Sequence, residues 1–298
     1  MDDPHRHLYR VLVVSLERLS FYFRSYQGIL MKPFLKWAGG KYSQLDQILH
    51  HLPKGERLFE PFVGAGSVFL NAGFKDVVLN DVNPDLINLY NILKHQGQRL
   101  LDEAERLCKW VNSEERYYAL QDRFNTREYT DYSMAAFFLI LNRTGFNGLC
   151  RYNQNLQFNV PWGKKTQAYF PREELEQYLN AGFNPQLFCT DFATVMNLAR
   201  SGDVIFCDPP YHPMPGKDGF TTYSGKKFDL SDQKRLVDTA VELRKRNVPT
   251  VITNSSAPII IDMYKKAGFE VHPLVARRSI SAGADQRGEV KDIIAILK

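Results

Sequence analysis

Short apolar runs and longer helical periods alternate along most of the chain. The short runs are typical of strands buried on both faces, whereas apolar positions spaced three to four residues apart indicate amphipathic helices. Strands linked by crossover helices form a mostly parallel sheet. We therefore predict an α/β fold in which the last two strands pair antiparallel through a loop. The predicted strands are residues 58–62, 77–80, 186–190, 204–207, 250–254, 271–275 and 292–297.

One long stretch interrupts this series of strands. Several helical periods follow one another between residues 84 and 143, and turn-forming glycine and asparagine come directly after them. This order indicates an inserted, mainly helical recognition subdomain, residues 84–171, within a catalytic domain built from residues 32–83 and 172–298. The predicted helices of the insert are residues 86–93, 100–111, 115–124 and 134–141.

The first 31 residues differ from the rest of the chain. They are rich in His, Arg and Tyr, and a second methionine, Met31, separates them from Lys32. They form either a loosely held extension or a short helix with a role of its own. We favour an extension that takes no part in function.

Composition narrows the class of protein further. A chain of 298 residues with 44% apolar residues can bury a full core. Its four cysteines stand too far apart for a CxxC metal pair or a disulfide framework, so we expect no metal site and a reducing, cytoplasmic compartment. The apolar run at residues 11–16 is too short to span a bilayer, so we expect no membrane contact. Nothing in the sequence indicates an obligate protein partner.

The basic charge is concentrated in one stretch of the chain, residues 132–172. The formal net charge is +5, yet there is no acidic residue between Asp131 and Glu173. Basic side chains interleaved with aromatic ones suit phosphates and base faces, so this stretch predicts a nucleic-acid surface. Its basic members are Arg143, Arg151, Lys164, Lys165 and Arg172, and its aromatic members are Phe146, Tyr152, Phe158, Trp162, Tyr169 and Phe170.

A glycine turn follows the first predicted strand. Gly64 and Gly66 allow a tight turn and a close approach to a ligand, and Ser67 is predicted to begin a helix behind them. Phe69 stands where the dinucleotide fingerprint has its third glycine, which argues against NAD. Asp81, at the tip of the next strand, can accept both hydroxyls of a ribose. Alone, each feature fits a structural role, but together they favour an adenosine-containing ligand.

The sequence Asp208-Pro209-Pro210-Tyr211 follows the buried strand 204–207. Two successive prolines fix the backbone and remove two amide donors, which leaves mainly acceptors. The Asp208 carboxylate and the Pro209 carbonyl can hold the hydrogens of an exocyclic amine, and Tyr211 can stack on a base extracted from a duplex. A proline-rich structural turn is the alternative.

Residues 212–228 follow this loop and contain three glycines and three lysines. This composition is typical of a flap that closes over a site, and equally of a solvated surface loop. The sequence leaves both interpretations open.

Taken together, four segments resemble the DNA adenine methylase (Dam) family. These are residues 34–41, 60–70, 141–153 and 208–211, in the order that the family shows. The resemblance runs from about Lys32 to the C-terminus. It implies a Rossmann-like class I methyltransferase sheet, S-adenosylmethionine as the cofactor, and double-stranded DNA as the partner. It also implies transfer of a methyl group to adenine N6 within GATC.

The resemblance assigns roles to individual residues as well. It implies that Arg151 makes a bidentate contact to guanine and that Phe146, where the family commonly has tyrosine, stacks near the vacated base position. The non-functional alternatives are a surface cation for Arg151, a core aromatic of the hairpin for Phe146 and core packing for Trp37. The implied cofactor residues are Trp37, Lys41, Phe62, Asp81, Asp191, Phe192 and Asp208, and the implied DNA-facing residues are Lys36, Phe146, Asn147, Leu149, Arg151 and Pro161.

Three other functions are compatible with parts of this pattern. Enzymes that methylate a glutamine side chain or an RNA base use related loops, but they usually have asparagine at the position of Asp208. A DNA-binding protein without catalysis has no need of an intact acceptor loop and glycine turn. A dehydrogenase would need the complete dinucleotide fingerprint.

Overall fold

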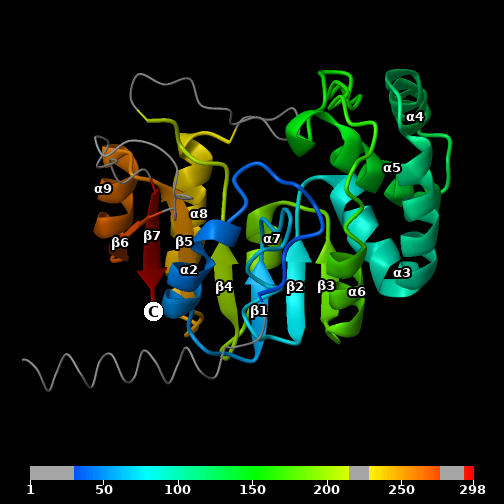
Figure 1. The fold of residues 1–298 in the computed structure, drawn as a ribbon. Coiled ribbons are helices and arrows are strands. Elements are labelled where there is room, and N and C mark those ends of the chain that lie inside the picture. Colours follow the sequence, from blue (N-terminus) through cyan, green and yellow to red (C-terminus); the bar gives the residue numbers. More distant parts are fainter. Residues whose placement is uncertain (1–29, 215–227, 276–291) are drawn as a thin grey trace, which may run out of the picture. The chain divides into compact units, whose positions relative to one another are not determined.

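The computed structural model describes residues 30–214, 228–275 and 292–298, and residues 32–298 belong to one compact unit. A seven-stranded sheet in the order β3-β2-β1-β4-β5-β7-β6 forms its centre (Figure 1). The first five strands are parallel, and β7 runs antiparallel between β5 and β6. The strands are β1 (Arg57–Glu60), β2 (Asp76–Asn80), β3 (Asn184–Phe188), β4 (Val204–Cys207), β5 (Thr250–Ser255), β6 (Glu270–Leu274) and β7 (Asp292–Leu297).

The predicted fold class is confirmed, and every predicted strand is present within two residues of its expected ends. The largest shift is in β3, which begins at Asn184 and includes Pro185. Proline cannot donate a ladder hydrogen bond, but β3 is an edge strand that pairs only with β2, so Pro185 is tolerated there. The antiparallel pairing of the last two strands is confirmed as well.

Three helices follow β2 and form the first part of the predicted insert: α3 (Pro84–Trp110), α4 (Glu114–Thr126) and α5 (Asp131–Thr144). The Asn83 side chain caps α3 by accepting hydrogen bonds from two backbone amides, and Pro84 fits the first turn. The two helical periods predicted within α3 are joined across a kink at Gln96. Figure 1 shows these helices beyond the β3 edge of the sheet.

The remaining helical elements are short or flank the sheet. They are η1 (Tyr42–Gln44), α2 (Leu45–His51), η2 (Phe146–Gly148), α6 (Arg172–Asn180), α7 (Phe192–Met196), α8 (Leu230–Arg244) and α9 (Pro258–Lys266). A capping box at Asp229 fixes the start of α8, because its carboxylate accepts the Asp232 amide and the Asp232 carboxylate accepts the Asp229 amide.

The prediction of a helix from Ser67 is wrong. Residues 61–72 form successive turns instead. Gly66 adopts a left-handed conformation with φ at 75°, and a Cβ there would come within 2.1 Å of the Phe69 ring. The Asn71 side chain also donates to the Ser67 carbonyl, which an α-helix would use for a backbone amide. The glycine turn therefore has no helix dipole behind it.

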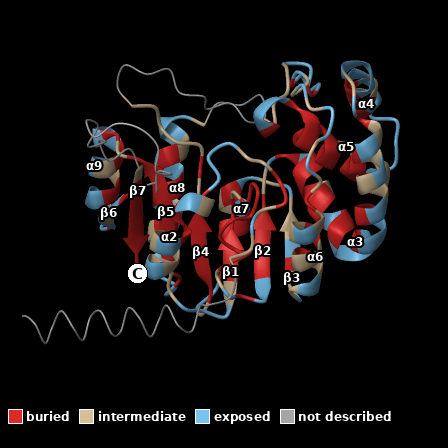
Figure 2. Cartoon of the chain, viewed as in Figure 1, coloured by how far each residue is buried: buried red, intermediate tan, exposed pale blue. Residues whose placement is uncertain are grey.

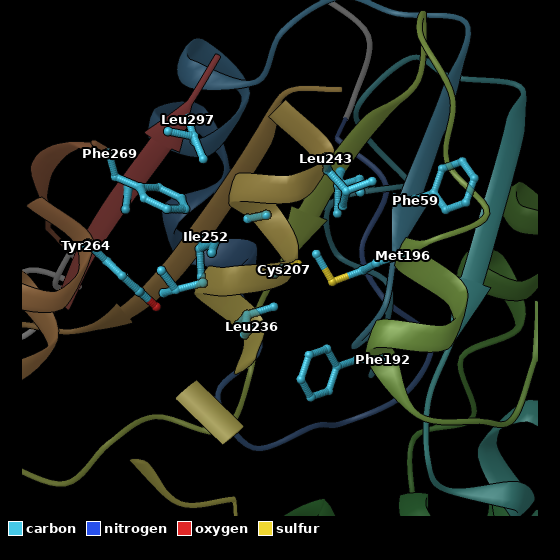
Figure 3. Close-up of a cluster of buried hydrophobic side chains, with 14 of the residues drawn as sticks. Phe59, Phe192, Met196, Cys207, Leu236, Leu243, Ile252, Tyr264, Phe269 and Leu297 are labelled. Atoms are coloured by element: carbon cyan, nitrogen blue, oxygen red, sulfur yellow. The ribbon is translucent and has the colours of Figure 1, made fainter. Parts of the chain in front are cut away.

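The main core lies between the sheet and helices α7, α8 and α9. Figure 2 shows that the central strands are buried along their length, and Figure 3 shows the side chains of this cluster. Phe59, Cys207 and Ile252 come from three neighbouring strands, and Leu236 and Tyr264 come from α8 and α9. This packing fixes the carboxyl ends of β1, β4 and β5, where the candidate site residues lie.

All four cysteines are free. Within residues 30–214, 228–275 and 292–298, no helix is long and apolar enough to cross a membrane. The same ranges contain no group of three or more His, Cys, Asp or Glu residues that could hold a metal ion. The predicted flap, residues 212–228, lies mostly outside the described residues, because residues 215–227 are not among them. Residues 1–29 of the predicted extension also lie outside the described residues.

Candidate active site and DNA-binding surface

A cavity of about 340 Å³ lies at the carboxyl ends of β1, β2 and β4. The strand order reverses here, since β2 lies on one side of β1 and β4 on the other. Open α/β sheets bind their ligands at such a switch point. Ten of the residues predicted to form the site line the cavity: Trp37, Lys41, Phe62, Gly64, Gly66, Asp81, Asp208, Pro209, Pro210 and Tyr211.

The Asp208 carboxylate is held from two sides. The Lys41 ammonium lies 2.7 Å from its Oδ2 atom, and the Thr253 hydroxyl donates to its Oδ1 atom at 2.7 Å. The same ammonium lies 4.8 Å from the ring centroid of Tyr211. Each carboxylate oxygen can accept more than one hydrogen bond, so these contacts orient Asp208 without exhausting it as an acceptor.

A buried polar network holds the loop 208–212 in place. Gln233 of α8 donates to the Pro210 carbonyl at 2.9 Å. Asn254 of β5 donates to Gln233 and to the Tyr264 hydroxyl, both at 2.9 Å, and it accepts from the His212 amide at 3.3 Å. Gln233 and Asn254 are fully buried. Sequence reasoning missed both residues. The one signal in the sequence was Asn254, a polar residue near the end of a largely apolar strand.

The glycine turn and Asp81 form the opposite wall of the cavity. The Gly64 amide donates to Asp81 Oδ2 at 3.2 Å, and the Asn83 amide donates to Oδ1 at 3.0 Å. Burial raises the pKa of Asp81 to about 6, against the opposing effect of these amides. Trp37 packs so closely on Gly64 that a Cβ there would come within 2.9 Å of the indole.

Glu60 at the end of β1 is a further cavity residue that sequence reasoning missed. It is buried, and its Oε1 atom has no hydrogen-bond partner among the described residues. Burial raises the pKa of Glu60, and the nearby Asp208 adds to this rise. A buried, unpartnered carboxyl oxygen facing a cavity suits a ligand that carries a donor or a positive charge.

Two predicted cofactor residues lie outside the cavity lining. Asp191 caps α7 and pairs with both terminal nitrogens of Arg235, at 2.7 and 2.8 Å. Phe192 is buried and packs against Phe62, with ring centroids 5.3 Å apart. In this arrangement Phe192 supports a wall of the cavity from behind, and Asp191 is engaged with α8.

Residues 150–160 form a hairpin, with an antiparallel bridge between Tyr152 and Phe158, and this predicted recognition hairpin is anchored by its backbone. Helix α4 presents Tyr117, Gln121 and Asn125 on one face. The first two donate to the Val160 carbonyl at 2.7 Å each, and Asn125 both donates to the Phe158 carbonyl and accepts from the Phe158 amide. These contacts fix the second strand of the hairpin to the helix, and sequence reasoning missed them.

A second anchor ties the first strand of the hairpin to α3. The Tyr152 hydroxyl donates to the Asp85 carboxylate at 2.7 Å, and Arg127 pairs with both oxygens of the same carboxylate. Asn83, whose amide binds Asp81, also donates to the Cys150 thiol at 3.3 Å. The hairpin is therefore connected through α3 to the wall of the cavity.

The loop 145–149 lies against the segment that carries Trp37. Asn142 is fully buried and bonds to both backbone groups of Lys36 and to the Gly148 carbonyl. Burial, followed by the hydrogen bond with Lys165 and then by the charges of Lys165 and Arg143, lowers the pKa of Lys36 to about 8. Arg143 is buried and donates to the Tyr169 and Phe34 carbonyls. Among the described residues, Lys36 and Lys165 form no ion pair with a carboxylate, so they suit an anion such as a phosphate.

The predicted DNA-facing residues lie along this loop and the hairpin. Phe146 is 49% exposed, which excludes its alternative as a core aromatic of the hairpin. Asn147 is exposed and left-handed, with φ at 52°, and Pro161 is exposed while its carbonyl accepts the Phe146 amide at 2.8 Å. Leu149 and Arg151 are partly exposed.

This sheet, with its antiparallel strand beside β5 and its cavity at the switch point, defines a Rossmann-like methyltransferase domain. Comparison with known proteins defines the family. Residues 37–280 match the model for the D12 class N6 adenine-specific DNA methyltransferases. The chain therefore belongs to this family, and its activity is that of an adenine-specific DNA methyltransferase.

Individual relatives agree with the family model. The chain is 48% identical over 266 residues to the DNA N-6-adenine-methyltransferase of Escherichia phage P1, which covers 89% of this chain but only 35% of the phage protein. It is 42% identical over 268 residues to the DNA adenine methylase of Escherichia coli K12, covering 90% of this chain and 95% of that enzyme. The DNA adenine methylase of Vibrio cholerae is 41% identical over 270 residues, with coverages of 89% and 95%. The dehydrogenase and glutamine or RNA methylation alternatives are thereby excluded.

Proposed function

We propose that this enzyme transfers the methyl group of S-adenosylmethionine directly to N6 of an adenine that has been flipped out of duplex DNA, within the sequence GATC. One observation carries the proposal: the acceptor loop at Asp208 and the glycine turn with Asp81 line the same cavity. A methyl donor bound at the turn would then lie beside an amine bound at the loop.

The cavity residues fit S-adenosylmethionine. Asp81 offers carboxylate oxygens to the ribose hydroxyls, and the unpartnered Oε1 of Glu60 suits the ammonium of the methionine part. Trp37 and Phe62 supply apolar surface for the adenine and the chain. When bound, the cofactor supplies an electrophilic methyl group on a sulfonium. The missing third glycine and the absence of a helix after the turn argue against a pyrophosphate in this place.

The loop 208–211 acts on the adenine. The amine of adenine is a weak nucleophile because its lone pair is delocalised into the ring. Two acceptors, the Asp208 carboxylate and the Pro209 carbonyl, hold its hydrogens, draw the nitrogen toward tetrahedral geometry and stabilise the positive charge that develops on it. Lys41 and Thr253 keep the carboxylate oriented. The amine is itself the nucleophile, so no cysteine is needed and no covalent enzyme intermediate forms.

The insert recognises the DNA. Lys36 and Lys165 suit the phosphate backbone, Phe146 is exposed for stacking near the vacated base position, and Arg151 suits a bidentate contact to guanine. The proposed target is GATC because the residues that carry this surface resemble the Dam family. Asn147, Leu149 and Pro161 complete the proposed DNA-facing set.

The proposal is tested in cells. The chain is expressed in a host whose own DNA lacks GATC methylation, and its DNA is digested with nucleases that distinguish methylated from unmethylated GATC. We expect complete protection from the nuclease that needs unmethylated sites. Unprotected GATC, with N6-methyladenine found in another sequence context, would contradict the proposed target, and DNA without N6-methyladenine would contradict the proposed reaction.

A further inference from the structure

Arg151 and Asn159 lie opposite each other in the recognition hairpin. The backbone amide of Asn159 donates to the backbone carbonyl of Arg151 at 3.1 Å. The Arg151 side chain donates two further hydrogen bonds to the same residue. Its Nε donates to Asn159 Oδ1 and its Nη2 donates to the Asn159 backbone carbonyl, both at 2.9 Å. One residue therefore binds one whole edge of the guanidinium.

This contact determines which edge of the guanidinium remains available. A guanidinium carries five N–H groups in a planar fork, and the Nε and Nη2 donors facing Asn159 form one of its edges. Among the described residues, Arg151 Nη1 has no hydrogen-bond partner. The edge formed by Nη1 and the second Nη2 hydrogen presents two parallel donors, which match O6 and N7 of guanine.

The two residues stand on a rigid base. Phe158 and Val160 are buried, and Asn159 between them is exposed because successive residues of an extended strand face opposite sides. The backbone groups of Phe158 and Val160 are bound by α4, as described above. On the other strand, the Tyr152 hydroxyl is fixed to Asp85. The backbone that carries Arg151 and Asn159 is thus held from both sides.

We propose that Asn159 is a positioning residue for sequence recognition, which holds the Arg151 guanidinium by its inner edge and directs the Nη1–Nη2 edge toward guanine. The inference rests on the proposed role of Arg151 as the guanine contact. An arginine side chain has many rotamers, and fixing it before DNA binds reduces the conformational entropy lost on recognition. The resulting gain in binding free energy applies only to the correct base pair, because only guanine offers both acceptors in that geometry.

Four single variants and one double variant test the proposal: Arg151→Ala, Asn159→Ala, Asn159→Asp, Asn155→Ala and Arg151→Ala with Asn159→Ala. For each, kcat/KM is measured on a GATC duplex and on duplexes with one base pair of the site replaced. Arg151→Ala should reduce discrimination at one base pair by roughly 10- to 100-fold. Asn159→Ala should reduce discrimination at that same base pair by about 5-fold.

The remaining variants separate positioning from a general effect on the hairpin. Asn159→Asp keeps the acceptor and should retain discrimination. Asn155→Ala, an exposed asparagine of the same hairpin, should behave as the wild type. The double variant should be no worse than Arg151→Ala, because Asn159 has nothing to position once the guanidinium is gone.

The outcomes that overturn the proposal are distinct from those that overturn the proposed function. If Asn159→Ala lowers kcat/KM equally on all duplexes, Asn159 is a phosphate contact. If the variant has wild-type kcat/KM on all duplexes, Asn159 does not position the Arg151 side chain. Either result, with Arg151→Ala still losing discrimination, refutes the inference alone. If Arg151→Ala itself leaves discrimination intact, the guanine-reading role of Arg151 fails, and the inference fails with it.

Discussion

The acceptor loop and the recognition hairpin are both held by buried polar side chains, but in different ways. In the loop, the network reaches the functional group itself, since Lys41 and Thr253 bind the Asp208 carboxylate directly. In the hairpin, α4 binds only backbone groups of residues 158 and 160. The side chains that we propose to contact DNA remain on the exposed side of the hairpin.

This difference matches what each region has to do. Catalysis needs an acceptor fixed to a fraction of an ångström, because a preorganised dipole costs no reorganisation during the reaction. DNA recognition needs a stable backbone frame from which exposed side chains reach the duplex. Changes in the loop should therefore act on the chemical step, and changes in the hairpin should act on DNA binding.

The largest expected effect is that of Asp208→Ala. Loss of the carboxylate removes one of the two acceptors for the amine, so kcat for methyl transfer to a GATC duplex should fall by about 10³-fold or more. Because Lys41 also loses its partner, folding is checked by thermal unfolding and by cofactor binding. Asp208→Asn keeps one acceptor oxygen and should recover part of the activity. Near-normal turnover by the alanine variant would refute the role of Asp208.

A paired experiment tests the contrast between loop and hairpin. Gln233→Ala releases the Pro210 carbonyl, whereas Asn125→Ala releases the backbone of Phe158. We expect the first to lower kcat and the second to raise KM for DNA, each by roughly tenfold, because each leaves a backbone group unpaired at about 1–3 kcal/mol. Steady-state kinetics with varied DNA separates the two parameters. The contrast fails if both variants change the same parameter.

Cofactor binding should depend on pH through Asp81. Its pKa of about 6 in the free enzyme means that the carboxyl is protonated below that pH and ionised above it. If the ribose hydroxyls donate to the ionised form, affinity is constant above pH 6 and falls by about tenfold per pH unit below it. Calorimetric titration measures this, and Asp81→Asn should bind weakly without that dependence. An affinity that rises on acidification would contradict the assignment.

The smallest expected effect on stability is that of Phe146→Ala. The side chain is about half exposed, so its removal should change the free energy of unfolding by less than about 0.5 kcal/mol. The same change should lower kcat/KM on duplex DNA, with less loss when the target adenine faces a mismatch that is easier to unstack. Denaturant titration and kinetics on both duplexes check this, and an equal loss on both would argue against a role in base flipping.

The sequence predicts the sheet well because its apolar runs are short and clearly bounded, so that β4 and β7 agree with the prediction at both ends. The glycine turn and Asp81 were recognisable because each follows a strand, and the carboxyl ends of parallel strands meet at one edge. The helix expected at Ser67 failed because the Phe69 ring lies under Gly66 and packs there against Tyr90, Tyr178 and Phe183. These three are tertiary contacts, and no local pattern reveals them.

The supporting residues could not be predicted for a related reason. Gln233, Asn125 and Tyr117 lie on helices, where a polar residue ordinarily faces water. Their partners, Pro210, Phe158 and Val160, are backbone carbonyls far away in the sequence, so only the folded chain identifies them. For Asp191 the resemblance implies a contact with the cofactor, and in the structure its carboxylate pairs with Arg235 of α8.

The most direct measurement follows a labelled methyl group. The enzyme is incubated with S-adenosylmethionine carrying a radioactive methyl and a duplex that contains one GATC, and the DNA is then digested to nucleosides. We expect all label in N6-methyldeoxyadenosine, and none when the adenine of that site is replaced on both strands. Label in another nucleoside or on the protein itself would contradict direct transfer to a flipped adenine held at Asp208.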